Sequence, residues 1–198
     1  MRLTVLVIFM MVCLSACGPD EIVPPDVGGA SPQLVTPAVP PGAVFLDACT
    51  HMVSYPEAIP PLDSTGLFFS AEINPNVSVM IQARRSETEE EGLTLEEISA
   101  RIRKNYSSEA MAQEFHPFVV KNYLGDDLTG LMGEFINAGG DRVRLLVVIQ
   151  PDSFLMDMVV DDVIYVISAQ APQDQWDQWA EQIDVFFQTF QPAMCGGV

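Results

Sequence analysis

The sequence has 198 residues, of which 27 are acidic and 9 are basic, so its formal net charge is −18 at pH 7. A surface with this excess of carboxylates repels phosphate backbones and anionic headgroups, which argues against nucleic-acid binding and against electrostatic docking on lipid. Cationic partners and divalent cations remain compatible with the charge. The acidic residues can also serve solubility alone.

The N-terminus has the layout of an export signal. Arg2 precedes an apolar run that ends at Leu14 and is shorter than the about 20 residues of a membrane-spanning helix. The stretch at the end of this run, Leu14-Ser15-Ala16-Cys17, resembles the bacterial lipobox. At a lipobox the signal peptide is cleaved before the cysteine, once that cysteine carries diacylglycerol. We therefore expect residues 1–16 to be a signal peptide and Cys17 to carry acyl chains such as palmitate. The alternative is ordinary signal-peptide cleavage that leaves Cys17 as an incidental thiol.

An anchor of this kind places the rest of the chain outside the cytoplasm, on the cell membrane or the outer membrane. Residues 17–43 are rich in proline and lack apolar periodicity, so we expect an extended tether. Residues 44–198 are long enough for one globular domain with a sizeable core.

Two cysteines, Cys49 and Cys195, remain near the start and the end of this domain. In an oxidising compartment outside the cytoplasm such a pair predicts a disulfide. Two distant thiols offer too few ligands for a structural metal.

Apolar or alternating runs predict the strands, in chain order. They are Met52–Tyr55, Leu67–Ile73, Val77–Ala83, Phe118–Leu124, Leu128–Ile136, Arg142–Ile149, Phe154–Val160 and Val163–Ala169. Residues 59–61 are expected to be a loop. Hairpin turns are expected at 74–76, at 137–140 and at Asp161-Asp162.

Two helices complete the prediction. An acidic and solvated loop, Glu87–Glu91, leads to Thr94-Leu95-Glu96-Glu97, which has the spacing of a capping box. A final helix is expected to begin near Pro172, with Trp176 and Trp179 on an apolar face that packs on the core. Strands and helices in this order predict an α+β fold, a meandering antiparallel sheet covered by helices.

Several local signatures resemble the PsbP/Mog-type family, which occurs in photosystem-associated proteins, a nuclear transport factor and many bacterial lipoproteins. They are Val53-Ser54-Tyr55-Pro56, the helix start at 93–98, and Tyr165–Ala169 leading to Pro172 and Trp176. The resemblance implies an α/β/α sandwich. Because family members mostly act as binding or assembly factors and share no catalytic constellation, it also implies a noncatalytic role.

Candidate chemistry is sparse. His51 lies two residues from Cys49, so on a strand the two would share a face, but Cys49 is better explained as a disulfide partner. His116 is expected in a solvated loop. We expect no catalytic residue, no cofactor and no enzymatic activity.

Asp157, Asp161 and Asp162 are weak candidates for oxygen ligands to calcium in the predicted hairpin. No EF-hand spacing is present, and turn chemistry explains the aspartates as well, so no metal site is predicted. The only basic cluster, Arg101, Arg103 and Lys104, is expected to pair with Glu97 on the first helix.

The leading hypothesis is a membrane-anchored protein-binding or assembly module. The alternative is a small-ligand or calcium-binding lipoprotein, which would need a pocket between sheet and helix.

Overall fold

The computed structural model describes residues 38–48, 50–57, 59, 61–65, 68–106, 114–155 and 158–193, without the side chains of 152–161. The predicted signal peptide, Cys17 and most of the predicted tether lie outside these residues, as do Cys49, Asp157 and Cys195. The described residues belong to one compact unit. Within them, no helix has the length and apolar character needed to cross a bilayer.

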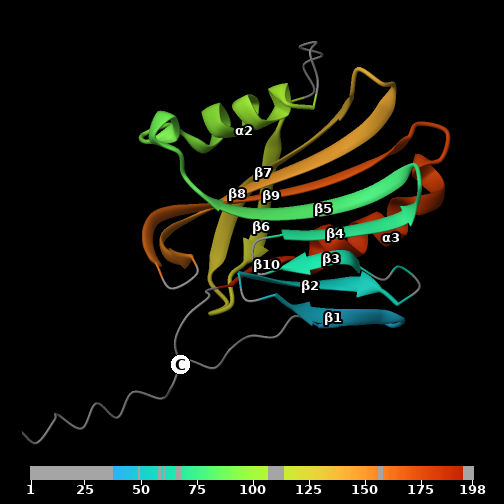
Figure 1. Ribbon diagram of the computed structural model, residues 1–198, viewed down its shortest axis with the longest axis horizontal. Coiled ribbons are helices and arrows are strands. Elements are labelled where there is room, and N and C mark those ends of the chain that lie inside the picture. Colours follow the sequence, from blue (N-terminus) through green and yellow to red (C-terminus); the bar gives the residue numbers. More distant parts are fainter. Residues whose placement is uncertain are drawn as a thin grey trace, which may run out of the picture. The chain divides into compact units, whose positions relative to one another are not determined.

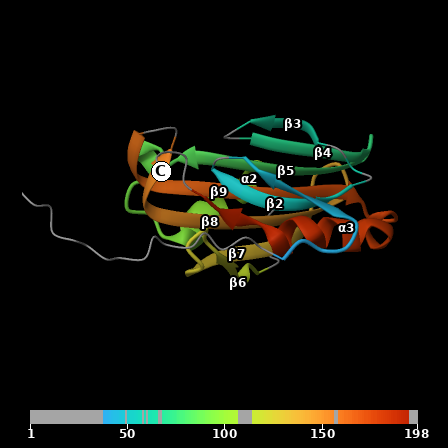
Figure 2. The same ribbon diagram turned by 90° about the horizontal axis from the view of Figure 1, so that it is seen from below.

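Most of the described chain forms antiparallel sheets, with two α-helices (Figure 1). The larger sheet has seven strands in the order β3-β4-β5-β9-β8-β7-β6, which Figure 2 shows from top to bottom. These strands are β3 (Pro61–Thr65), β4 (Phe68–Asn74), β5 (Val77–Arg85), β6 (His116–Lys121), β7 (Asp127–Ile136), β8 (Asp141–Leu155) and β9 (Met158–Pro172).

A smaller sheet has three strands in the order β1-β2-β10, and all its pairings are antiparallel. Its strands are β1 (Ala43–Asp47), β2 (His51–Pro56) and β10 (Gln191–Pro192). The helices are α2 (Leu95–Lys104) and α3 (Trp176–Thr189), and a short 3-10 helix covers Thr88–Glu90.

The two helices pack on opposite faces of the larger sheet. Because successive residues of a strand point to opposite faces, β8 contributes to two hydrophobic clusters. Leu146 and Val148 belong to the cluster that contains Phe186 and other residues of α3, together with Val53 of β2. The alternate residues Val143, Leu145 and Val147 belong to the cluster that contains Ile98 and Ile102 of α2. Each face of the central strands is therefore covered.

Aromatic packing holds α3 on its face. The ring centroids of Phe69 and Phe186 lie 5.8 Å apart, and those of Tyr55 and Phe69 lie 6.0 Å apart. Trp176 is 2% exposed, and Trp179 packs against the same cluster. The prediction that the two tryptophans serve core packing is confirmed.

Most of the predicted strands are present, and the helix start at Thr94 is confirmed. The Thr94 hydroxyl accepts from the Glu97 amide, and the Glu97 carboxylate accepts from the Thr94 amide at 2.8 Å. Three short strands were missed, and one of them, β10, has only two residues. β1 has only five residues, and β3 begins with a proline in a stretch predicted to be a loop.

The predicted hairpin at Asp161-Asp162 is wrong. Both residues lie inside β9, where Asp162 pairs with Pro151, and the connection lies between Leu155 and Met158, which pair with each other. The ladder with β8 continues through the two aspartates, so tertiary pairing overrides their local preference for a turn.

Two boundaries also differ from the prediction. Pro172 ends β9 and pairs with Asp141, so α3 begins later, at Trp176. β6 covers His116–Lys121 rather than Phe118–Leu124, because the Asn122 side chain accepts from two amides of the following turn and ends the strand.

Candidate functional site

His51 is sealed in the interior where β2 pairs with β10. The residue is fully buried, and its ring centroid lies 6.3 Å from that of Phe190. Its Nδ1 lies 3.1 Å from the Thr50 hydroxyl, and its Nε2 has no hydrogen-bond partner within the described structure. Burial lowers the pKa of His51 to about 4, against a smaller opposing effect of Asp47. The imidazole is therefore neutral at pH 7 and closed off from solvent.

The end of the described chain is held from three sides at this place. The Ala193 amide donates to the Thr50 carbonyl at 2.8 Å, and the Tyr123 amide donates to the Pro192 carbonyl at 3.0 Å. From β9, the Tyr165 hydroxyl donates to the Ala193 carbonyl at 3.1 Å, and burial raises the pKa of this hydroxyl. The segment around β10 therefore connects the small sheet to the large one.

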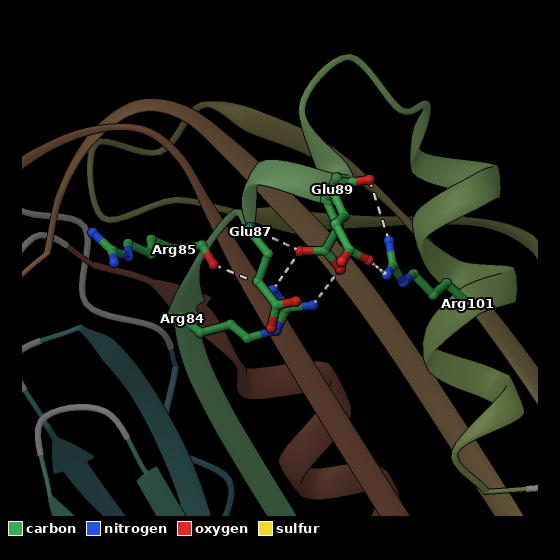
Figure 3. A network of polar contacts seen from close by, with 6 residues as sticks. Arg84, Arg85, Glu87, Glu89 and Arg101 are labelled. Carbon is green, nitrogen blue, oxygen red and sulfur yellow. Dashed lines mark hydrogen bonds and ion pairs between the residues drawn. The ribbon is translucent and has the colours of Figure 1, made fainter.

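A second polar network lies between β5 and α2 (Figure 3). Arg84 donates to both carboxylate oxygens of Glu90, at 2.6 and 2.7 Å, and the Glu87 amide adds a third hydrogen bond at 3.0 Å. The hydrogen bonds from Arg84 hold the pKa of Glu90 below its usual value, although burial opposes this. Glu90 is only 3% exposed, so the prediction of a solvated acidic loop is wrong at this residue.

The same network reaches α2. The Arg101 guanidinium forms an ion pair with the Glu89 carboxylate and donates to the Glu89 carbonyl at 3.2 Å. The predicted partner, Glu97, is instead engaged in the capping box with Thr94. The prediction for Arg101 is therefore wrong, because the 3-10 helix brings Glu89 to it from outside the helix.

A third network joins α3 to the large sheet, and sequence reasoning did not find it. Glu134 of β7 accepts from Arg142 Nε at 3.0 Å and from Arg144 Nε at 2.6 Å, and Arg144 also pairs with Asp184 of α3. Both guanidinium groups lie over the Trp176 ring, at 5.0 and 5.4 Å from its centroid. The sequence feature that could have predicted this network is the spacing of Arg142 and Arg144, because residues two apart on a strand lie on the same face.

Burial alone would raise the pKa of Glu134, but hydrogen bonds from Arg142 and Arg144 outweigh it and hold the pKa below its usual value. The Glu134 carboxylate is charged, and both of its oxygens accept hydrogen bonds from arginine. This third network therefore contributes to the framework and offers no free base.

The candidate metal residues are only partly described. Asp161 and Asp162 are successive residues of β9, and the Asp162 carbonyl accepts from the Ser86 amide at 3.2 Å. In the part of the chain that the structure describes, no three side chains of the metal-binding types are grouped. His116 is exposed, as predicted, but it begins strand β6 rather than lying in a loop.

Among the described residues, single large apolar side chains are exposed on edge strands of both sheets. Leu62 of β3 is 66% exposed and Val119 of β6 is 57% exposed, and these strands are the two edges of the larger sheet. Val44 lies on β1, an edge of the smaller sheet, while Val39 and Leu124 lie close to β1 and β6 in the chain. The sheet edges therefore combine apolar surface with backbone groups at the end of a ladder.

No protein-family model matches the sequence, and no curated protein matches it. Among solved structures, the cyanobacterial PsbP (CyanoP) of Synechocystis sp. PCC 6803 is 13% identical with a TM-score of 0.44, and the match covers 91% of this chain and 99% of that one. LpqN of Mycobacterium tuberculosis, involved in cell envelope biogenesis, is 13% identical with a TM-score of 0.42, and the match covers 76% of this chain and 90% of LpqN.

A structure from Bacteroides thetaiotaomicron VPI-5482 is 11% identical with a TM-score of 0.40, and this chain spans half of its length. At these low TM-scores the similarities carry no inference about activity or partners.

Proposed function

We propose that this protein is a lipid-anchored, extracytoplasmic module of the cell envelope that binds a protein partner without catalysing a reaction. The proposal combines the expected anchor at Cys17 and the expected tether with a domain whose fold we propose to be the PsbP-like α/β/α sandwich. The positions of α2 and α3 on opposite faces of the large sheet support that fold assignment.

The observation that carries the binding function is the exposure of Leu62 and Val119 on the two edge strands of the larger sheet. An edge strand leaves backbone N–H and C=O groups without a neighbouring strand, and an extended peptide can add to it. Apolar side chains beside such an edge supply contact area and specificity. A protein partner is therefore the class of ligand that either of these two edges fits.

Charge favours a partner other than the membrane surface. Cleavage before Cys17 would remove Arg2 and no acidic residue, which changes the formal charge from −18 to −19. A domain of this charge is repelled by anionic headgroups, and a proline-rich tether would hold it at a distance from them.

The test is crosslinking in cells that produce the full-length protein, followed by purification under denaturing conditions. Three forms are compared: wild type, Cys17→Ala without the lipidation site, and Leu62→Ser/Val119→Ser with weakened edges. We expect one specific protein at near-stoichiometric recovery with wild type and a clear loss with each variant.

Lys104→Arg, an exposed change at the end of α2 and outside the edge strands, serves as the matched control and should retain the partner. Recovery of no partner from any form would contradict the proposal and favour ligand binding. Thermal-shift measurements with calcium and small molecules would then test that alternative. An unmodified Cys17 in the intact mass would contradict the anchor alone.

A further inference from the structure

Strand β6 forms one edge of the larger sheet, where its neighbour among the described strands of that sheet is β7. Figure 2 shows it along the lower margin of the sheet. The residue pairs between β6 and β7, from His116–Met132 to Lys121–Asp127, contain no register shift. The six residues of β6 extend about 20 Å at roughly 3.3 Å per residue. The strand therefore presents an uninterrupted run of backbone groups on its outer side.

Two hydrogen bonds just after β6 show which way its backbone groups point. The Asn122 amide donates to the Asp126 carbonyl, on the side of β7, at 2.9 Å. The next amide, that of Tyr123, donates at 3.0 Å to the Pro192 carbonyl of β10, on the other side. The segment β10 therefore already accepts one outward amide at this end of the strand.

The same alternation extends back along β6. Successive N–H groups of an extended chain point to opposite sides, so the amides of Val119 and Lys121 share the outward direction of Tyr123. The amide of Val120, between them, points toward β7. Pro117 is also an outward position, and a proline is tolerated where no neighbouring strand needs its N–H group. We call the outward backbone groups of Pro117, Val119 and Lys121 the outer row.

The other edge strands are less suited to the addition of a further strand. The pairing of β3 with β4 shifts register between Pro61 and Asp63, so the exposed Leu62 lies at an irregularity. Bulges, prolines and charged residues on an edge strand hinder pairing with another chain. On β1, an edge of the smaller sheet, Val44 is only 36% exposed. Among the described edges, β6 therefore best combines a regular register with exposed apolar surface.

The side chains around the outer row define the chemistry of a matching segment. Val119 is apolar and 57% exposed at the centre of the strand. An exposed acidic residue lies beyond each end of β6, Glu114 before it and Asp126 after it. Lys121 is already paired with Asp127, at 2.6 Å. The surroundings of the outer row are therefore apolar at the centre and acidic beyond both ends.

We propose that the outer row binds an extended, apolar segment of a protein partner, flanked by lysine or arginine, as an added strand. The inference rests on the proposed protein-binding function and deepens it by naming the edge and the chemistry of the segment. Main-chain hydrogen bonds to Val119 and Lys121 supply affinity, and the Val119 side chain supplies apolar contact. The basic flanks meet Glu114 and Asp126. An anionic membrane and a second copy of this chain, with its formal charge of −18, are disfavoured by like charge.

Hydrogen exchange measured by NMR on the full-length protein in detergent tests the direction of the backbone groups. The probe is a synthetic peptide of alternating valine and threonine between paired lysines, and the same peptide between paired glutamates is the control. In the free protein the Val119 and Lys121 amides should exchange much faster than the Val120 amide. Saturation with the lysine-flanked peptide should slow exchange at Val119 and Lys121 by about tenfold and leave Val120 unchanged.

Two outcomes of this measurement would overturn the proposal. One is slow exchange of the Val119 amide in the free protein, at the rate of the Val120 amide. The other is the absence of protection by the lysine-flanked peptide, or equal protection by the glutamate-flanked control.

Two variants at Val119 separate the backbone from the side chain. Val119→Ala keeps the outward N–H group, whereas Val119→Pro removes it and leaves the pairing with β7 intact. In fluorescence-anisotropy titrations, Val119→Ala should weaken peptide binding by about threefold and Val119→Pro by about a further fivefold. Leu62→Ser on β3 is the matched control and should bind as wild type does. Equal affinities of the two Val119 variants would contradict strand addition.

The near-ultraviolet circular dichroism of Val119→Pro should match that of wild type. If it does not, the exchange measurement on the wild-type protein decides, because it needs no variant.

Crosslinking in cells separates this inference from the proposed function. Val119→Pro and Leu62→Ser are compared one at a time with wild type. Loss of the partner with Val119→Pro but not with Leu62→Ser supports β6 as the docking edge. Every other pattern with a partner present overturns this inference and leaves the protein-binding function standing. Recovery of no partner from wild type contradicts the function itself.

Three further measurements identify the occupant of the outer row. A photoreactive amino acid at position 119 should form an adduct with a partner segment that contains apolar residues flanked by lysine or arginine, and a segment without basic residues would contradict the proposal. Binding to phosphatidylcholine/phosphatidylglycerol vesicles that is lost in Val119→Pro would overturn it in favour of a membrane contact. Dimerisation in sedimentation that is lost in the same variant would overturn it in favour of a second copy.

Discussion

The Thr50 carbonyl accepts a hydrogen bond from the Ala193 amide at 2.8 Å, so the beginning and the end of the domain lie side by side. Thr50 follows Cys49 directly, and Ala193 precedes Cys195 by two residues. Successive Cα atoms are about 3.8 Å apart, and a disulfide joins Cα atoms separated by about 4.4–6.8 Å. The described neighbours are therefore close enough for the predicted Cys49–Cys195 disulfide, which itself stays a prediction.

We expect peptide mapping under non-reducing conditions to recover Cys49 and Cys195 in one linked pair. Reduction should lower the free energy of unfolding by about 2–5 kcal/mol, because the bond closes a very long loop. Urea unfolding with and without reductant measures the change, and Cys49→Ser/Cys195→Ser should match the reduced protein. Labelling of both thiols in the native, oxidised protein would refute the disulfide.

His51 should make the domain sensitive to mild acid. Burial lowers the pKa of His51 to about 4 from the ordinary value of 6.5, so the fold favours the neutral ring. This contribution is fully present above about pH 6.5. It is lost as the pH falls toward 4, by roughly 3 kcal/mol in total, because the unfolded chain binds the proton more tightly.

The measurement is the free energy of urea unfolding between pH 7 and about pH 4. His51→Gln should flatten this pH dependence, whereas His116→Gln, at an exposed residue, should follow the wild-type curve. Identical pH profiles for wild type and His51→Gln would rule out the buried histidine as the cause.

Local patterns predicted most strands and the start of α2, because an alternation of apolar residues or a capping box can be recognised from a few neighbouring residues. The course of β9 through Asp161 and Asp162 was not predictable in this way. Its register is set by β8 and β5, and β5 lies about eighty residues earlier in the chain. The helix α3 was placed too early for the same reason, because Pro172 completes a pairing with Asp141.

The polar networks show the same limit. Helical spacing predicted that Arg101 pairs with Glu97, yet the actual partner is Glu89, presented by a 3-10 helix that local patterns did not reveal. The burial of His51 likewise depends on β10, which is more than one hundred residues away in the sequence. Contacts of this kind follow from topology rather than from neighbouring residues.

The Arg84–Glu90 pair should contribute strongly to stability, since Glu90 is almost completely buried. Glu90→Gln leaves the Arg84 guanidinium without its carboxylate and should lower the free energy of unfolding by about 2–3 kcal/mol at pH 7. Because the folded pKa of Glu90 is depressed, this contribution is present above the unfolded pKa and is lost as the pH falls through the folded value.

Urea unfolding measures the effect, and Lys121→Ala is the control. The Lys121–Asp127 pair is more than half exposed on both sides, so its loss should change the free energy of unfolding by less than about 1 kcal/mol. Equal losses of unfolding free energy in the two variants would show that the buried Arg84–Glu90 pair stabilises the fold no more than an exposed pair does.

Arg144 should tolerate lysine poorly although the charge is kept. Its guanidinium pairs with Glu134 and Asp184 and lies over the rings of Trp176 and Phe187, and a lysine ammonium cannot form these planar contacts together. We expect Arg144→Lys to lower the free energy of unfolding by about 1–2 kcal/mol. Lys104→Arg, the reverse exchange at the last residue of α2, should be nearly neutral in the same urea titration, and comparable losses in both variants would contradict a specific role for the Arg144 guanidinium.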